Sequence, residues 1–183
     1  DGLIVWLKAD AVSSSDHSQV RLSGSDIFVK QWVDQSGNNH PASNGTDNDQ
    51  PMYIAGALNG QPVLRFAQRD EDNGSRLYLG DLGLYSANAG TVFAVATIDN
   101  DGRYNLFGNR DNDERWVADT WTESHPGSFR NNRTSGTFTP GSWPTTGSHV
   151  FALESDRAVY RVLVDGTEIG SDTADYHSGS GQN

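Results

Sequence analysis

The chain has 183 residues, which is enough for one well-filled hydrophobic core and too few for two typical domains. Its 24 acidic residues outnumber its 13 lysines and arginines and give a formal net charge of -11, which excludes nucleic acid as the expected partner because polyanions are repelled. The absence of cysteine excludes disulfide scaffolds, thiolate catalysis and zinc–thiolate sites.

The apolar segments of the chain are all short. No run of about 18 apolar residues occurs, so we expect no membrane insertion. The opening residues 1–7 have a strand-like pattern, and the Gly/Ser-rich residues 178–183 are typical of a flexible tail or linker. We therefore expect one module over residues 1–177, monomeric and part of a longer chain.

Segments rich in β-branched and aromatic residues follow one another, separated by Gly, Asn, Asp and Pro. The predicted strands are 3–7, 27–33, 62–66, 76–79, 91–98, 104–107, 115–118, 149–153 and 158–164. Asp165-Gly166 predicts a two-residue hairpin turn, and Asn59-Gly60 predicts another turn. No long window has a helical period. The pattern therefore predicts an all-β protein, an antiparallel β-sandwich of the jelly-roll kind.

Three polar segments, 10–26, 37–50 and 119–147, are predicted to be long loops. Loops of this length inside a compact domain are usually functional. The third segment mixes aromatic and guanidinium groups, which indicates either a binding surface or a set of caps and ion pairs at the edge of the sandwich.

Oxygen-bearing side chains gather in two clusters after the strand 91–98. Crowded carboxylates repel one another unless a cation lies among them, and calcium accepts about six to eight oxygen ligands in irregular geometry. The sequence therefore predicts calcium as a cofactor. The alternative is a set of solvated acidic turns, because Asp and Asn are common turn residues. The candidate metal ligands are Asp99, Asp101, Asn109, Asp111 and Asp113, with Asp70 and Asp72 as a further pair.

A ligand pocket is predicted around two arginines in the third polar segment. A guanidinium group recognises carboxylates in bidentate fashion, and Asn pairs with a peptide backbone or with sugar hydroxyls. Trp121 or Trp116 supplies a flat wall in this interpretation. The alternative, in which the arginines pair with the acidic loops, is equally open. The candidate binding residues are Arg130, Asn131, Asn132, Arg133, Trp121 and Arg110.

Catalytic motifs are missing from the sequence. It has no Gly-x-Ser-x-Gly elbow, no His-Glu-x-x-His and no cysteine nucleophile. Only five glutamates are present to fill paired-carboxylate roles, although Asp pairs can replace them. We therefore expect a protein that is not an enzyme.

Several segments together resemble the laminin-G-like, concanavalin A-type sandwich modules of large bacterial surface proteins. The most specific is Trp32-Val-Asp-Gln-Ser-Gly-Asn38, which is similar to a Trp-x-Asp-x-Ser-Gly-Asn element of those modules. The other matching segments are residues 2–10, 50–53, 57–66, 147–155 and 160–166.

Within that group the chain looks most like the calcium-dependent, peptide-binding module of RTX-type adhesins. The resemblance implies a concanavalin A-like jelly roll, bound calcium, an extracellular place on the bacterial cell surface and a role in adhesion and biofilms. It implies as partner a short peptide or a protein C-terminus, captured through its free carboxylate. A glycan on a host or neighbouring cell is the second candidate, and a structural spacer without a ligand is the third.

Overall fold

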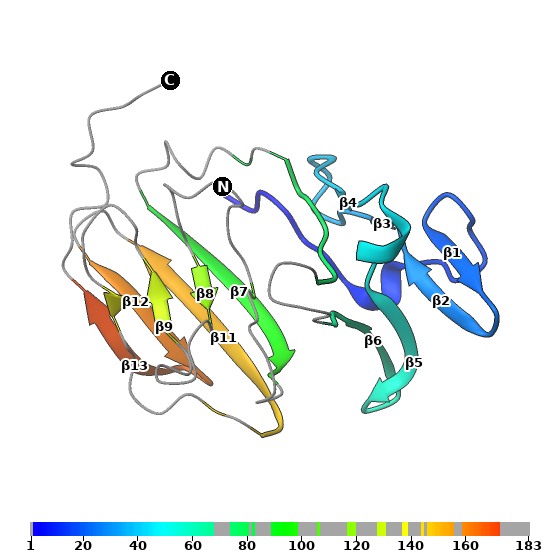
Figure 1. Cartoon of the computed structure of the whole chain (residues 1–183). Helices are drawn as coiled ribbons and strands as arrows, with labels where there is room; N and C mark the ends of the chain where they lie inside the picture. The colour runs from blue at the N-terminus through cyan, green and yellow to red at the C-terminus, as the bar shows by residue number, and fades with distance from the viewer. Residues whose placement is uncertain are drawn as a thin grey trace. The chain divides into compact units, whose positions relative to one another are not determined.

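A computed structural model shows a chain built from short antiparallel strands (Figure 1). It describes residues 2–67, 74–80, 82, 89–98, 106, 117–119, 128–130, 137–138, 144, 146–155 and 159–172. In these residues the helical elements are two single turns of 3-10 helix, η1 Ala9–Ala11 and η2 Asp47–Asp49, and no helix is long and apolar enough to span a bilayer. The predicted all-β, antiparallel class is confirmed.

The chain divides into two compact units, residues 1–82 and 83–183. The first contains β1 to β6 and the second β7 to β13, and each has its own sheets and its own buried cluster. The single sandwich module over residues 1–177 and its jelly-roll connectivity stay predictions.

The first unit holds a four-stranded sheet in the order β1-β2-β5-β6, with every neighbouring pair antiparallel. A separate two-stranded sheet pairs β3 with β4. The strands are β1 Val20–Ser23, β2 Asp26–Val29, β3 Gln31–Trp32, β4 Ala42–Ser43, β5 Met52–Leu58 and β6 Gln61–Arg65.

The turn between β5 and β6 confirms its prediction. Leu58 pairs with Gln61, and the two residues between them, Asn59 and Gly60, have φ angles of 50° and 79°. Asn and Gly are the residues that adopt positive φ most readily, which is why this dipeptide closes a tight hairpin.

The core of the first unit forms where η1, β1 and β2 supply small branched side chains. Val12, Val20 and Val29 are 5%, 1% and 0% exposed. Partly buried hydrophobic residues pack against them; these are Ile27, Trp32, Tyr53, Leu64 and Leu77.

Several local predictions for this unit are wrong. The predicted loop 10–26 contains β1, and the predicted loop 37–50 contains β4 and η2. The predicted strand 27–33 divides at Lys30 into β2 and β3. The predicted strands 3–7 and 76–79 each form one isolated bridge, Leu7 with Asp34 and Tyr78 with Ser43. Side-chain hydrogen bonds, described below, hold these two segments in place of a ladder.

The second unit holds a four-stranded antiparallel sheet in the order β13-β12-β11-β7 and a three-stranded one in the order β10-β9-β8. In Figure 1 the first runs from green β7 to red-orange β13. The strands are β7 Gly90–Thr97, β8 Val117–Asp119, β9 Ser128–Arg130, β10 Thr137–Phe138, β11 Ser148–Ser155, β12 Tyr160–Val164 and β13 Thr167–Asp172.

Sequence pattern and turn chemistry explain this larger sheet. β7 alternates between half-buried and exposed positions along its whole length, as expected of a strand with one covered face. The predicted Asp165-Gly166 turn is confirmed, with φ angles of 50° and 78° between paired Val164 and Thr167. The buried cluster on the covered face consists of Ile98, Phe151, Leu153, Val162 and Val164.

Candidate functional site

Of the predicted site residues, only Arg130 belongs to the part of the chain that the structure describes. The strands that flank the others are described, so the points where each loop leaves and rejoins a sheet are known. The predicted residues outside the described ranges are Arg110, Trp121, Asn131, Asn132, Arg133, Asp70, Asp72, Asp99, Asp101, Asn109, Asp111 and Asp113.

Arg130 lies at a junction of three strands. It is the last residue of β9, and its Cα partners are Val117, the first residue of β8, and Thr137, the first residue of β10. Because these strands are antiparallel, the chain enters β8, leaves β9 and enters β10 at the same end of one small sheet. The acidic segment before Val117 and the Arg/Asn segment after Arg130 are therefore attached at that end.

The two tryptophans considered for the pocket wall differ in their attachment to this sheet. Trp116 immediately precedes Val117 and is tied to the Arg130 end. Trp121 follows Asp119, which pairs with Ser128 at the opposite end. The strand order thus favours Trp116 as the nearer aromatic group, although a three-residue strand is only about 7 Å long between its terminal Cα atoms. The role of Trp121 stays a prediction.

The predicted ligands Asp99 and Asp101 follow the buried end of β7. Ile98 is 7% exposed and belongs to the hydrophobic cluster, so it anchors the start of this segment. The preceding residue, Thr97, pairs with Ser148, and their hydroxyl oxygens are 2.7 Å apart. The segment therefore leaves the sheet from a fixed position beside the start of β11.

The segment that carries Asp70 and Asp72 is closed at its base. The backbone N–H of Ser75 donates to the carbonyl of Ala67 at 2.8 Å, so the chain returns to where it left after β6. Arg76, next to this closure, forms a 2.7 Å ion pair with Asp49.

Among the residues that the structure describes, no group of three or more His, Asp or Glu side chains is arranged to hold a metal ion. The predicted calcium ligands all lie outside those residues, so calcium binding stays a prediction.

The best-defined polar cluster of the described chain surrounds Asp34. Its Oδ1 accepts hydrogen bonds from the backbone N–H groups of Trp6 at 2.9 Å and Ser36 at 2.8 Å. Its Oδ2 accepts from the backbone N–H of His40 at 3.0 Å and contacts the Ser36 hydroxyl at 2.7 Å. Partial desolvation opposes the charged form, but the bonds from His40, Trp6 and Ser36 outweigh it and hold the pKa of Asp34 well below its ordinary value.

Neighbours of Asp34 in the same motif hold the opening segment of the chain as well. The Asn38 amide donates to the carbonyls of Leu3 at 2.7 Å and Ile4 at 2.9 Å. The Trp32 indole N–H donates to the Lys8 carbonyl at 2.7 Å. The Trp-x-Asp-x-Ser-Gly-Asn element is therefore a structural clamp on residues 3–8, which explains why that segment is held without a strand ladder.

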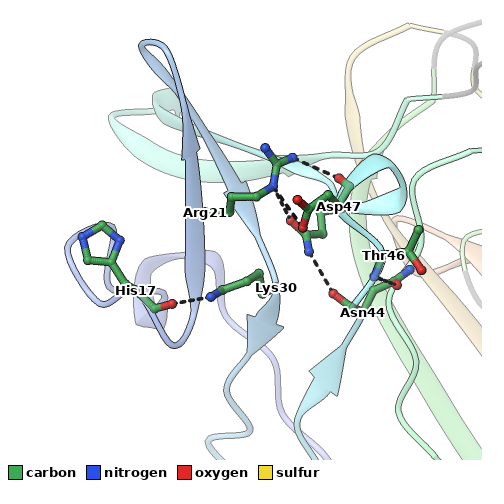
Figure 2. Close-up of polar contacts among 7 residues, drawn as sticks. His17, Arg21, Lys30, Asn44, Thr46 and Asp47 are labelled. Atoms are coloured by element: carbon green, nitrogen blue, oxygen red, sulfur yellow. Dashed lines mark hydrogen bonds and ion pairs between the residues drawn. The ribbon is translucent and has the colours of Figure 1, made fainter.

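A second polar network, which we did not predict, centres on the buried amide of Gln50 (Figure 2). Gln50 is 1% exposed; its Oε1 accepts from Arg21 Nε at 3.1 Å, and its Nε2 donates to the Asn44 carbonyl at 3.0 Å. The Arg21 guanidinium also donates to the Asp47 carbonyl at 3.0 Å and lies 4.5 Å from the centre of the Phe28 ring. Buried polar groups persist when they are bonded in this way.

The network extends through Asn44, which is 6% exposed. Its side chain accepts from the Thr46 N–H at 2.9 Å and donates to the Arg76 carbonyl at 3.0 Å. Nearby, the Lys30 ammonium donates to the His17 carbonyl, as Figure 2 shows. Because these buried amides bond to the protein itself, the network fixes the loops around β1 and β2 and leaves its polar groups engaged.

In the second unit, His149 and Asp165 form a bonded pair beside the β12–β13 turn. His149 Nδ1 lies 2.7 Å from Asp165 Oδ2, and Nε2 lies 2.9 Å from the Thr146 carbonyl. Both ring nitrogens thus face acceptors, and only the imidazolium has an N–H on each. The hydrogen bond to Asp165, followed by that to Thr146, raises the pKa of His149, and the bonds from His149 and Val150 lower the pKa of Asp165.

This pair predicts a stability window in pH. The ordinary pKa of His149 is 6.5 and its folded value is raised, so its contribution is complete below 6.5 and is lost as pH rises through the folded value. Asp165 has the opposite sign: its contribution is present above 3.8 and is lost as pH falls through the lowered folded value. Titration of the His149 ring by NMR, beside melting temperature against pH, measures both.

The matched control for the pH window is Asp165→Asn, which keeps a residue that tolerates the positive φ of the turn. In this variant the pKa of His149 should return toward its ordinary value, and the melting temperature should lose its fall above neutral pH. A wild-type His149 that titrates at or below 6.5 would contradict the pairing.

No protein-family model, curated protein or solved structure matches the chain. The fold itself therefore places the chain, as an all-β protein of antiparallel sheets with a strand junction at Arg130. The resemblance to laminin-G-like modules stays a prediction carried by the segments quoted above.

Proposed function

We propose that the chain is a calcium-supported, non-catalytic binding module of an extracellular adhesin. Its ligand is a short peptide or a protein C-terminus, recognised by its free carboxylate. The Arg/Asn segment that begins at Arg130 supplies the carboxylate site, and the acidic segments supply the calcium ligands.

One observation carries this proposal: Arg130 has Cα partners in both β8 and β10. Asp111 and Asp113 are a few residues before Val117, and Asn131 to Arg133 directly follow Arg130. Chain connectivity therefore attaches the proposed calcium segment and the proposed carboxylate segment to one end of one sheet, where a cation and an anionic ligand belong together.

Charge balance explains why calcium and ligand depend on each other in this proposal. A chain with a net charge of -11 repels a carboxylate, and free Asp side chains compete with it for the arginines. Calcium bound among the Asp side chains cancels their charge and leaves Arg130 and Arg133 available for bidentate bonding to the ligand. The alternative, in which the arginines neutralise the acidic segments, thus describes the calcium-free state.

A peptide library tests the proposal, with every peptide made with a free and with an amidated C-terminus and with a glycan array beside it. We expect binding in calcium, none after chelation, and loss on amidation. A ligand that prefers the folded state must also raise the melting temperature. Equal binding of free and amidated peptides would reject carboxylate capture, glycan binding alone would favour the lectin alternative, and no ligand-dependent shift at all would favour a spacer.

A further inference from the structure

The outer edge of β7 carries unpaired backbone groups. β7 ends its four-stranded sheet, and among the described residues its only partner strand is β11. The N–H of Val150 donates to Asp165 Oδ1 at 2.9 Å, and its carbonyl accepts from the Asp165 N–H at 2.8 Å. Val150 therefore bonds away from β7, and its partner Val95 must direct its own N–H and C=O away from β11, because bonded and non-bonded pairs alternate in an antiparallel ladder.

The same alternation applies along the strand. Thr91, Phe93 and Thr97 lie at even spacings from Val95, so they also present their N–H and C=O groups at the outer edge. Long edges of this kind are normally protected by charges, prolines or bulges. Gly90–Thr97 contains no charged residue and no proline, and its register with β11 is unbroken over all eight pairs.

The side chains at this edge are apolar and exposed. Phe93 is 70% exposed and Val95 is 68% exposed, and both project from the face opposite the buried cluster. In a chain with a net charge of -11, an uncharged strand is a place where two copies approach without opposing like charges.

We propose that two copies of the chain pair edge to edge through β7, about a two-fold axis at Ala94. This register puts Phe93 opposite Val95 of the second copy and Thr91 opposite its Thr97. It pairs all four residues whose backbone groups face outward, and aromatic–β-branched and Thr–Thr pairs are favourable across strands. A two-fold interface is self-complementary in this sense, and the sheet becomes continuous across both copies. The inference is independent of the proposed ligand site and replaces the monomer expected from sequence.

Sedimentation velocity of the full chain, from micromolar to submillimolar concentration, tests the pairing. We expect a monomer–dimer equilibrium that Val95→Pro abolishes, because proline removes an outward N–H without removing a bond to β11. Phe93→Lys should abolish it as well by placing like charges near the axis. The matched control is Val150→Lys: it charges the same face on the inner strand β11, where 43% of the residue is exposed, and should leave dimerisation intact.

Hydrogen exchange on the wild-type chain gives a second readout that does not depend on variants folding. The amides of Thr91, Phe93, Val95 and Thr97 should become at least several-fold more protected as concentration rises, while the intervening amides, already bonded to β11, should not change. The proposal is overturned by a monomer at all concentrations, by a dimer that survives both edge variants, or by a dimer lost in Val150→Lys. Alternate amides already protected in the monomer would also overturn it, since another segment of the same chain would then occupy the edge.

Discussion

Replacing Arg130 by Gln is expected to weaken binding of a peptide with a free C-terminal carboxylate by on the order of ten- to a hundredfold. The substitution removes one guanidinium fork from the end of the sheet where β8, β9 and β10 meet. Because an amidated peptide has no carboxylate for the fork, its residual binding should change little. Isothermal titration of matched free and amidated peptides measures the difference.

The control for Arg130→Gln is Arg65→Gln, which removes the same charge from an exposed position at the end of β6. It should leave peptide affinity within about twofold of the wild type, since a single distant surface charge is largely screened. Equal losses in both variants would show that the chain's overall charge, and not a carboxylate site at Arg130, governs binding. Arg130→Gln should also retain calcium uptake, which separates loss of the carboxylate site from loss of the calcium site.

Asp34→Ala is expected to release the opening segment of the first unit. The carboxylate accepts backbone bonds from Trp6, Ser36 and His40, and alanine supplies no acceptor in their place. The amides of these three residues should exchange with solvent on the order of tenfold faster or more, and the melting temperature should fall. Because the pKa of Asp34 is held low, the wild-type clamp should persist to strongly acidic pH.

Asp26→Ala is the control for the clamp, because Asp26 is exposed at the start of β2 in the same unit. It should leave exchange at Trp6 and His40 unchanged. If Asp34→Ala leaves these amides as protected as in the wild type, the motif is not the clamp that its hydrogen bonds indicate.

Local chemistry made part of this fold predictable. The turns at Asn59-Gly60 and Asp165-Gly166 follow from residues that accept positive φ, and both hairpins form. β7 and β6 lie within one residue of their predicted bounds because each combines β-branched residues with a clear boundary. These features depend on a few adjacent residues, which is the range that sequence patterns describe best.

The wrong local predictions have the opposite cause, since distant contacts decide them. β1 contains Arg21 and Ser23 and has the composition of a loop, yet it pairs along its full length with β2. The opening residues 3–7 have the composition of a strand, yet contacts from Asp34 and Asn38 hold them in place of a ladder. Composition alone cannot weigh such partners, because they lie about thirty residues away along the chain.

The candidate site was predictable in residue type but not in arrangement. Guanidinium, amide and carboxylate groups indicated a carboxylate and cation site, whereas the pairing of Arg130 with Val117 and Thr137 comes only from the structure. Gln50 and Asn44 were missed because nothing in an isolated polar residue marks it as buried. Their position on either side of the η2 turn was the available signal.

Calorimetric titration of calcium into the metal-stripped chain tests the central proposal most directly. We predict saturable uptake that is lost when Asp111 and Asp113 are both replaced by Asn, because neutral amides are weaker ligands for a hard divalent cation. Addition of calcium should also raise the melting temperature by linkage. A metal-stripped chain that takes up no calcium, and melts at the same temperature with and without it, would contradict the proposal that calcium supports the binding site.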